Sequence, residues 1–121
     1  MLAAVKTYLE AQGHANISTD VIPADPDEIV ALFCWNHQPD RPGFSSGPRY
    51  VQVRVRRYDA DQARAACQAI TDLLNSGADE SPIPLTYPGK VIGWVRRFPI
   101  LMERTDTTVT YYSEIALWGK I

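Results

Sequence analysis

The chain has 121 residues and a mass of 13.5 kDa, which is the length of one domain spanning residues 1–121. Hydrophobic residues make up 45% and charged residues 21%, and a net charge of −2 argues against a protein that coats DNA through surplus Lys and Arg. Two cysteines are too few for a disulfide framework, no apolar run approaches the length of a membrane span, and the N-terminus does not resemble a secretory signal. We therefore expect a single-domain, cytoplasmic-type protein with reduced thiols.

The first third of the chain predicts a helix followed by two strands. Residues 2–12 are predicted to be helical because their apolar side chains recur at helical spacing, and Gly13 is placed to end the helix. Residues 15–22 are rich in β-branched types and predict a short strand, and the two prolines of 23–28 predict a turn. Residues 29–35 (IVALFCW) are continuously apolar and predict a strand buried on both faces, with a short helix as the alternative.

The middle of the chain contains the clearest strand and the clearest helix. Residues 36–49, with three prolines and two glycines, predict a long loop. Residues 50–58 alternate, so that the valines at 51, 53 and 55 face one side and Gln52, Arg54 and Arg56 face the other. Asp59 is placed to cap a helix over about 60–75. The apolar residues of that helix form one stripe: Ala63, Ala66, Cys67, Ile70, Leu73 and Leu74.

The last third predicts a loop and a β-hairpin. Residues 77–90 contain three prolines and are expected to be a second long loop. Residues 91–102 form the first arm of the hairpin and 109–118 the second, joined by a turn at 103–108. Pro99 cannot donate a ladder hydrogen bond, so the first arm should be an edge strand or bulged there. The expected faces of the second arm are Val109, Tyr111, Ile115 and Leu117 on one side, and Thr110, Tyr112, Glu114 and Trp118 on the other.

These elements follow the order α-β-β-β-α-β-β. Runs of strands with only two helices favour the α+β class. We predict a mainly antiparallel sheet of about five strands with both helices packed on one face.

The cysteines and histidines are weak candidates for a metal site or a nucleophile. Cys34 and His37 form a C-x-x-H pair, and Cys67 and His14 are the remaining candidates for the four ligands that structural zinc needs. The alternative is that both thiols are small buried hydrophobes, and an apolar environment raises the pKa of a thiol and leaves it unreactive. We expect no metal.

No catalytic motif is present in the sequence. The patterns G-x-S-x-G, G-x-x-x-x-G-K-[ST] and G-x-G-x-x-G are absent, and PGK at 88–90 is only a fragment of a phosphate loop. The carboxylate pairs Asp25/Asp27 and Asp59/Asp61 lie where turns and helix caps use such residues. We expect no catalytic residues and no cofactor, and a small enzyme using Cys34 is the least favoured hypothesis.

Basic and acidic residues occupy separate segments. Residues 41–57 contain no acid and five arginines, which are Arg41, Arg49, Arg54, Arg56 and Arg57. Residues 20–28 contain no base and four acids, which are Asp20, Asp25, Asp27 and Glu28. One interpretation is a nucleic-acid face on the Arg-rich strand 50–58, and a second is an ordinary solvated face. A third is an interface in which the basic strand of one copy meets the acidic loop of the next.

The aromatic residues suggest a second candidate interface. Trp118, on the same predicted face as Tyr112, is a candidate interface residue. The alternative is a small hydrophobic cluster beneath a helix.

The middle and end of the chain resemble a known family. An apolar strand (IVALFCW), a Pro/Gly-rich loop and the segment YVQVRVRRYDADQARAACQAITDLL are similar to the minor capsid or tail-terminator proteins of long-tailed bacteriophages. The closing segment RRFPILMERTDTTVTYYSEIALWG resembles the last hairpin of that family. The resemblance covers nearly the whole chain.

This resemblance implies a structural role in virion assembly. Proteins of the family form a hexameric ring that caps the tail tube, so the implied partners are further copies of the chain, the major tail tube protein and the head-completion or connector proteins. It places the protein at the head–tail junction, or in the host cytoplasm during assembly, with no membrane and no specific nucleic acid. The candidate interface residues are Arg49, Arg54, Arg56, Arg57, Asp25, Asp27, Glu28, Tyr112 and Trp118. A nucleic-acid-binding α+β domain remains the alternative.

Overall fold

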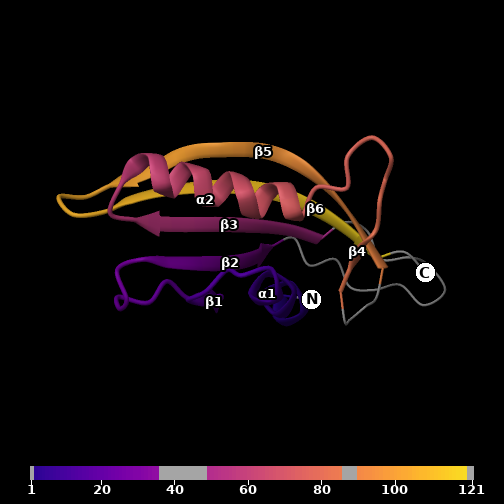
Figure 1. Ribbon diagram of the computed structural model, residues 1–121, viewed down its shortest axis with the longest axis horizontal. Coiled ribbons are helices and arrows are strands. Elements are labelled where there is room, and N and C mark those ends of the chain that lie inside the picture. The colour runs from indigo at the N-terminus through magenta and orange to yellow at the C-terminus, as the bar shows by residue number, and fades with distance from the viewer. Residues whose placement is uncertain (1, 36–48, 86–89, 120–121) are drawn as a thin grey trace.

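The computed structural model describes residues 2–35, 49–85 and 90–119 (Figure 1). The two helices are α1 (Leu2–Ala11) and α2 (Ala60–Leu73). The strands are β1 (Ile17–Thr19), β2 (Ile29–Trp35), β3 (Arg49–Arg57), β4 (Ile83–Pro84), β5 (Lys90–Arg104) and β6 (Val109–Gly119). Of the predicted loop at 36–49, residues 36–48 lie outside the described residues, and Arg49 is the first residue of β3.

The strands form one six-stranded sheet in the order β1-β2-β3-β6-β5-β4. Neighbouring strands are antiparallel except for β1 and β2, which are parallel. The α+β class is therefore confirmed, whereas the count of five strands is wrong. The additional strand is β4, which lies inside the segment predicted as a loop at 77–90 and pairs with the beginning of β5. Because β4 has only two residues and one of them is a proline, the sequence shows no alternation there that would predict a strand.

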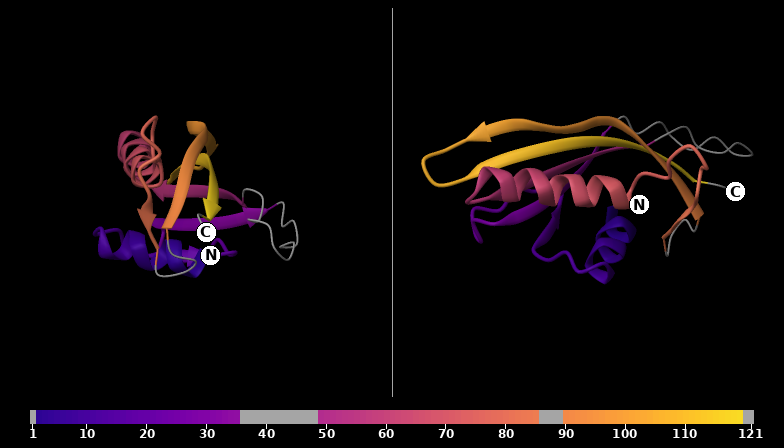
Figure 2. Two further views of the ribbon diagram at one scale, coloured as in Figure 1. Left: turned by 90° about the vertical axis from the view of Figure 1, so that its right-hand side faces the viewer. Right: turned by 45° about the horizontal axis from the view of Figure 1, so that its top comes forward.

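Both helices pack on the same face of the sheet (Figures 1 and 2). The valines at 51, 53 and 55 of β3 are fully buried and lie opposite Cys34, Leu32 and Val30 of β2, so both strands present this row to the helices. Val5 and Leu9 of α1 cover one part of this row, and Cys67, Ile70 and Leu74 from the α2 region cover the other. The predicted alternation of β3 is thus confirmed, and it determines which side chains of the strand are buried in the core.

The caps of α2 follow from its flanking residues. The Asp59 side chain accepts a hydrogen bond from the Gln62 amide at 3.0 Å, which satisfies one of the free N–H groups of the first turn. The helix ends at Leu73, two residues before the predicted end, and Leu74 is fully buried in the core. Gly77 follows with a φ of +73°, a conformation that glycine adopts without steric cost.

The end of α2 lies directly against β5 at Gly93. The Ser76 amide donates to the Gly93 carbonyl at 2.7 Å, and the Gly93 amide donates to Ser76 Oγ at 2.9 Å. A Cβ atom placed on Gly93 would lie 1.9 Å from the backbone carbonyl oxygen of Leu74. Only glycine therefore allows the helix end and the strand to approach this closely.

A pair of buried hydroxyl groups joins α2 to β6 inside the core. Thr71 and Ser113 are both fully buried, and their hydroxyl oxygens are hydrogen-bonded at 2.7 Å. The Thr71 hydroxyl also donates to the Cys67 carbonyl at 2.6 Å. Each hydroxyl thus has a partner in a region without solvent.

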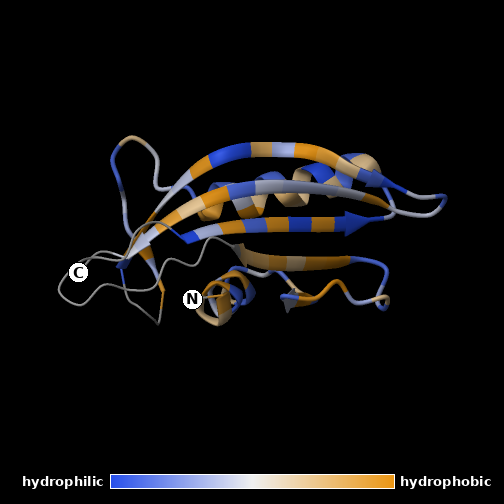
Figure 3. Cartoon of the chain, turned by 180° about the vertical axis from the view of Figure 1, so that it is seen from behind, coloured by the Kyte–Doolittle hydropathy of each residue, from blue (hydrophilic) through white to orange (hydrophobic). Residues whose placement is uncertain are grey.

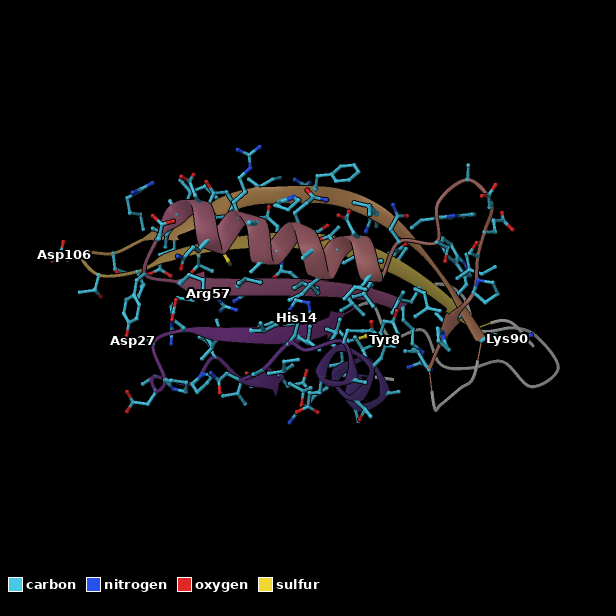
Figure 4. The ribbon with its side chains drawn as sticks, in the orientation of Figure 1. Tyr8, His14, Asp27, Arg57, Lys90 and Asp106 are labelled. Carbon is cyan, nitrogen blue, oxygen red and sulfur yellow. The ribbon has the colours of Figure 1, made fainter. Side chains whose placement is uncertain are left out.

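The β5–β6 hairpin is long and irregular. Its register shifts between Val95 and Arg97, between Arg97 and Ile100, and between Leu101 and Glu103. The middle shift contains Pro99, so the predicted bulge there is confirmed. The hairpin extends beyond the start of α2, and Asp106 lies at its outer tip (Figure 4).

Candidate functional site

The face of the sheet opposite the helices carries most of the candidate interface side chains. The rows of β3 and β6 that alternate with the core residues face this side, and Figure 3 shows the sheet from here with α2 behind it. They include Gln52, Arg54, Arg56, Tyr112, Glu114 and Trp118. No helix among the described residues covers this side, which we call the open face.

Arginines on the open face lie over aromatic rings. The Arg54 guanidinium is 4.4 Å from the centre of the Phe33 ring, and its Nε donates to Gln52 Oε1 at 2.5 Å. The Arg96 guanidinium is 4.2 Å from the centre of the Tyr50 ring. Such contacts are electrostatically favourable because the ring face is negative. They hold two cationic groups on the strands β3 and β5 in defined positions.

Arg56 binds the acidic segment of its own chain. Its Nε donates to the Asp27 carbonyl at 2.6 Å. Its Nη2 donates to the carbonyls of Pro23 and Pro26 at 2.9 and 3.1 Å, with a longer contact of 3.4 Å to Ala24. One guanidinium thus satisfies several carbonyls of a proline-rich turn that has few partners of its own.

The neighbouring residues reinforce this connection. Arg57 donates to the Ile29 carbonyl at 3.1 Å, and the Tyr58 hydroxyl donates to Asp27 Oδ2 at 3.1 Å, which raises the pKa of Tyr58. Figure 4 shows Asp27 and Arg57 at the same end of the sheet. Arg56 and Tyr58 thus contact the acidic segment within one chain, whereas a contact between the basic strand of one copy and the acidic loop of another stays a prediction. Asp25 is exposed and Glu28 is half-buried.

Replacing Arg56 by alanine should loosen the turn at 23–27. The variant loses the hydrogen bonds to the turn carbonyls, and we expect a loss of about 1–3 kcal/mol in the free energy of unfolding, at the scale of charged hydrogen bonds. We expect Arg56→Lys to recover only part of it, because an ammonium cannot reproduce the fork of the guanidinium. Urea denaturation with Gln62→Ala as a surface control measures this, and equal stability of Arg56→Ala and wild type would contradict it.

Trp118 lies at one end of the open face in contact with a second tryptophan. The ring centres of Trp94 and Trp118 are 4.7 Å apart, at an interplanar angle of 67°. The two rings, Ile92 and Glu80 line a hollow of about 270 Å³. Tyr112 lies on the same face of β6, opposite Arg54. Sequence reasoning identified Trp118 but missed Trp94 and Glu80, because only the register of β5 and the return of the chain at β4 bring them together.

The outer half of β5 is an exposed apolar edge that sequence reasoning also missed. Within the described residues, β4 pairs with β5 only at Lys90 and Val91, so the later part of β5 has no neighbour on that side. Four large apolar side chains lie along it with exposures of 42–59%, and they are Phe98, Ile100, Leu101 and Met102. We call these four residues the β5 patch. Unpaired backbone beside apolar side chains is a template for pairing with another chain.

The two cysteines differ in burial, since Cys67 is buried and Cys34 is only partly buried. Burial raises the pKa of the Cys67 thiol to about 11, although hydrogen bonds from Ser113 and Thr71 oppose the shift. Burial also raises the pKa of Cys34, against the opposing effect of the Arg49 guanidinium. In residues 2–35, 49–85 and 90–119, no three His, Cys, Asp or Glu side chains are arranged to hold a metal ion. His37 lies outside these ranges.

Arg49 begins β3 opposite Leu117, at the same end of the sheet as the two tryptophans.

No helix in the described part of the chain is long and apolar enough to cross a membrane. No protein-family model matches the sequence, and a search of curated proteins finds no match.

Proposed function

We propose that this protein is a structural assembly subunit, similar to the tail terminators of long-tailed phages, that associates with copies of itself into a ring. The ring would cap a tail tube and join it to the head-completion or connector proteins. The sequence resemblance supports this proposal. So does the order of elements, because the strand, helix and closing hairpin on which the resemblance rests correspond to β3, α2 and the β5–β6 hairpin.

The observation that carries the proposal is the β5 patch. Phe98 is 59% and Leu101 46% exposed on a strand edge that has no partner in the described part of the chain. A monomer rarely keeps such an edge uncovered, because water contact with apolar surface is unfavourable and unpaired strands promote association. A second copy of this chain is the occupant that the proposal assigns to it.

The contact between copies would be head-to-tail. Such a contact uses two different surfaces of each copy, and it closes into a ring when the rotation between copies permits. The unpaired edge of β5 and the β5 patch beside it supply one of these surfaces, and the exposed residue Arg104 lies at the end of the strand. The proposal does not assign Arg56 to this contact, because its guanidinium already binds the turn of its own chain.

Light scattering coupled to size-exclusion chromatography tests the proposal. We expect the wild type to elute with a mass several times 13.5 kDa, increasing with concentration, and to form rings visible by negative-stain electron microscopy. Leu101→Glu should shift the mass to that of one chain, since burying a charge at an apolar contact is costly. Ala65→Glu, which adds the same charge on the exposed side of α2, should leave the assembly unchanged. Wild type that stays monomeric at every concentration would contradict self-association.

A nucleic-acid-binding function is the second candidate, and the arginine–aromatic pairs of the open face favour it. Arg54 over Phe33 and Arg96 over Tyr50 resemble the mixed cationic and stacking surfaces that bind single strands. The same chromatography separates the two functions through the ratio of absorbance at 260 and 280 nm. Bound nucleic acid that is removed by salt supports this candidate, and no binding of an oligonucleotide at low salt excludes it.

A further inference from the structure

We propose that Trp94, Trp118 and Glu80 form a binding site for one cationic side chain, an arginine or a lysine, presented by a partner polypeptide. This inference rests on the geometry of these residues and does not require that the protein forms rings.

The two tryptophans form a corner with two ring faces. In the sheet, Trp118 pairs with Ile92 and Trp94 with Ala116, so the two rings are diagonal neighbours on the open face. At a centre distance of 4.7 Å and an angle of 67°, the edge of one ring points at the face of the other. A group placed beside this contact therefore touches a face of each ring.

The corner is open to an approaching side chain. Trp94 is 42% exposed, and Ile92, which pairs with Trp118 in the sheet, also lines the hollow of about 270 Å³. This is below the usual range of roughly 300–1,000 Å³ for pockets that enclose a small-molecule ligand. The head of one long side chain fits such a space while its backbone stays outside.

Glu80 gives the corner its charge preference. It follows a turn in which its amide donates to the Gly77 carbonyl at 3.1 Å, and its backbone has a φ of +52°. Glu80 makes no ion pair with any described residue, and it lines the same hollow as the rings. Ring faces and a carboxylate both attract a cation, and both are unfavourable for phosphate. The chemistry therefore selects a guanidinium or an ammonium and disfavours a nucleic acid at this corner.

Nuclear magnetic resonance titration with amino-acid amides tests the site. The probes are Nα-acetyl-arginine methylamide, the corresponding lysine derivative and the citrulline derivative, which has the shape of arginine without its charge, all at constant ionic strength. We expect saturable shifts of the Trp94 and Trp118 indole N–H signals with the arginine probe and at least tenfold weaker binding of the citrulline probe. Equal binding of the arginine and citrulline probes would overturn the proposal.

Two variants separate the site from general surface charge. Glu80→Gln keeps the shape of the hollow and should weaken binding of the arginine probe by at least threefold, whereas Asp79→Asn removes a neighbouring exposed carboxylate and should change it little. Trp118→Leu should abolish saturable binding. Equal effects of the two acid-to-amide variants would overturn the role of Glu80. Tighter binding of tetramethylammonium than of the arginine probe would overturn the assignment to a polypeptide side chain.

Discussion

Gly93→Ala is expected to destabilise the protein by about 3 kcal/mol or more, which lowers the melting temperature by roughly 10 °C for a domain of this size. The added methyl group would lie 1.9 Å from the Leu74 carbonyl oxygen, which is backbone and cannot rotate away. It would also lie 3.0 Å from Leu117 and 3.1 Å from Ile83. Relief of the clash requires α2 to move away from β5, which breaks both hydrogen bonds between Ser76 and Gly93.

Gly13→Ala is the matched control for this prediction. Gly13 has a φ of +97°, but a Cβ atom there has no neighbour within 4 Å, so its replacement costs only the backbone strain of about 1 kcal/mol. Thermal unfolding followed by circular dichroism compares the two variants. A Gly93→Ala variant as stable as Gly13→Ala would show that α2 and β5 do not approach as closely as described.

Removing either of the buried hydroxyls of Thr71 and Ser113 should destabilise the protein. Removing both should lower the free energy of unfolding by less than the sum of the two single losses. Thr71→Val leaves the Ser113 hydroxyl without its oxygen partner, at a cost of about 1–3 kcal/mol. Ser113→Ala should lower the free energy of unfolding by less, because the Thr71 hydroxyl keeps its hydrogen bond to the Cys67 carbonyl. The double variant replaces a hydrogen-bonded polar pair by an apolar pair, so it leaves no hydroxyl without a partner. It should therefore recover part of the stability that the single variants lose.

A double-mutant cycle measured by chemical denaturation provides the coupling energy between the two hydroxyls. We expect at least 0.5 kcal/mol, since contacting residues rarely act independently. Additive effects of the single variants would mean that the two groups do not share a hydrogen bond in solution.

The sequence predicts well those elements whose signal is local. The alternation in 50–58 and the cap at Asp59 depend on neighbours in the chain, and the structure confirms both. The order of strands depends on long-range pairing and could not be predicted in this way. The parallel pairing of β1 with β2 and the position of β6 between β3 and β5 leave no local pattern.

In the candidate site, too, the features with a local signal could be predicted, and those that depend on long-range pairing could not. Segregated charge was visible in the sequence, but composition does not say whether Arg56 meets the acidic turn of its own chain or that of another. Trp118 was assigned to the correct face because the alternation of β6 is regular. The apolar edge at Phe98–Met102 was missed because three register shifts in β5 prevent a simple assignment of its faces.

The position of β6 has a consequence for the order of events during synthesis. Residues 109–119 are made after all the other described elements, yet they pair with β3, more than fifty positions earlier, and complete the interior of the sheet. Until they leave the ribosome, β3 has an open edge and Cys67, Ile70 and Leu74 pack against an incomplete surface. Folding of this chain is therefore expected to wait for the synthesis of β6 and to be comparatively slow, as for other topologies rich in distant contacts. A chain that stops before β6 would lack an interior strand, and the nascent protein would depend on chaperones during that interval.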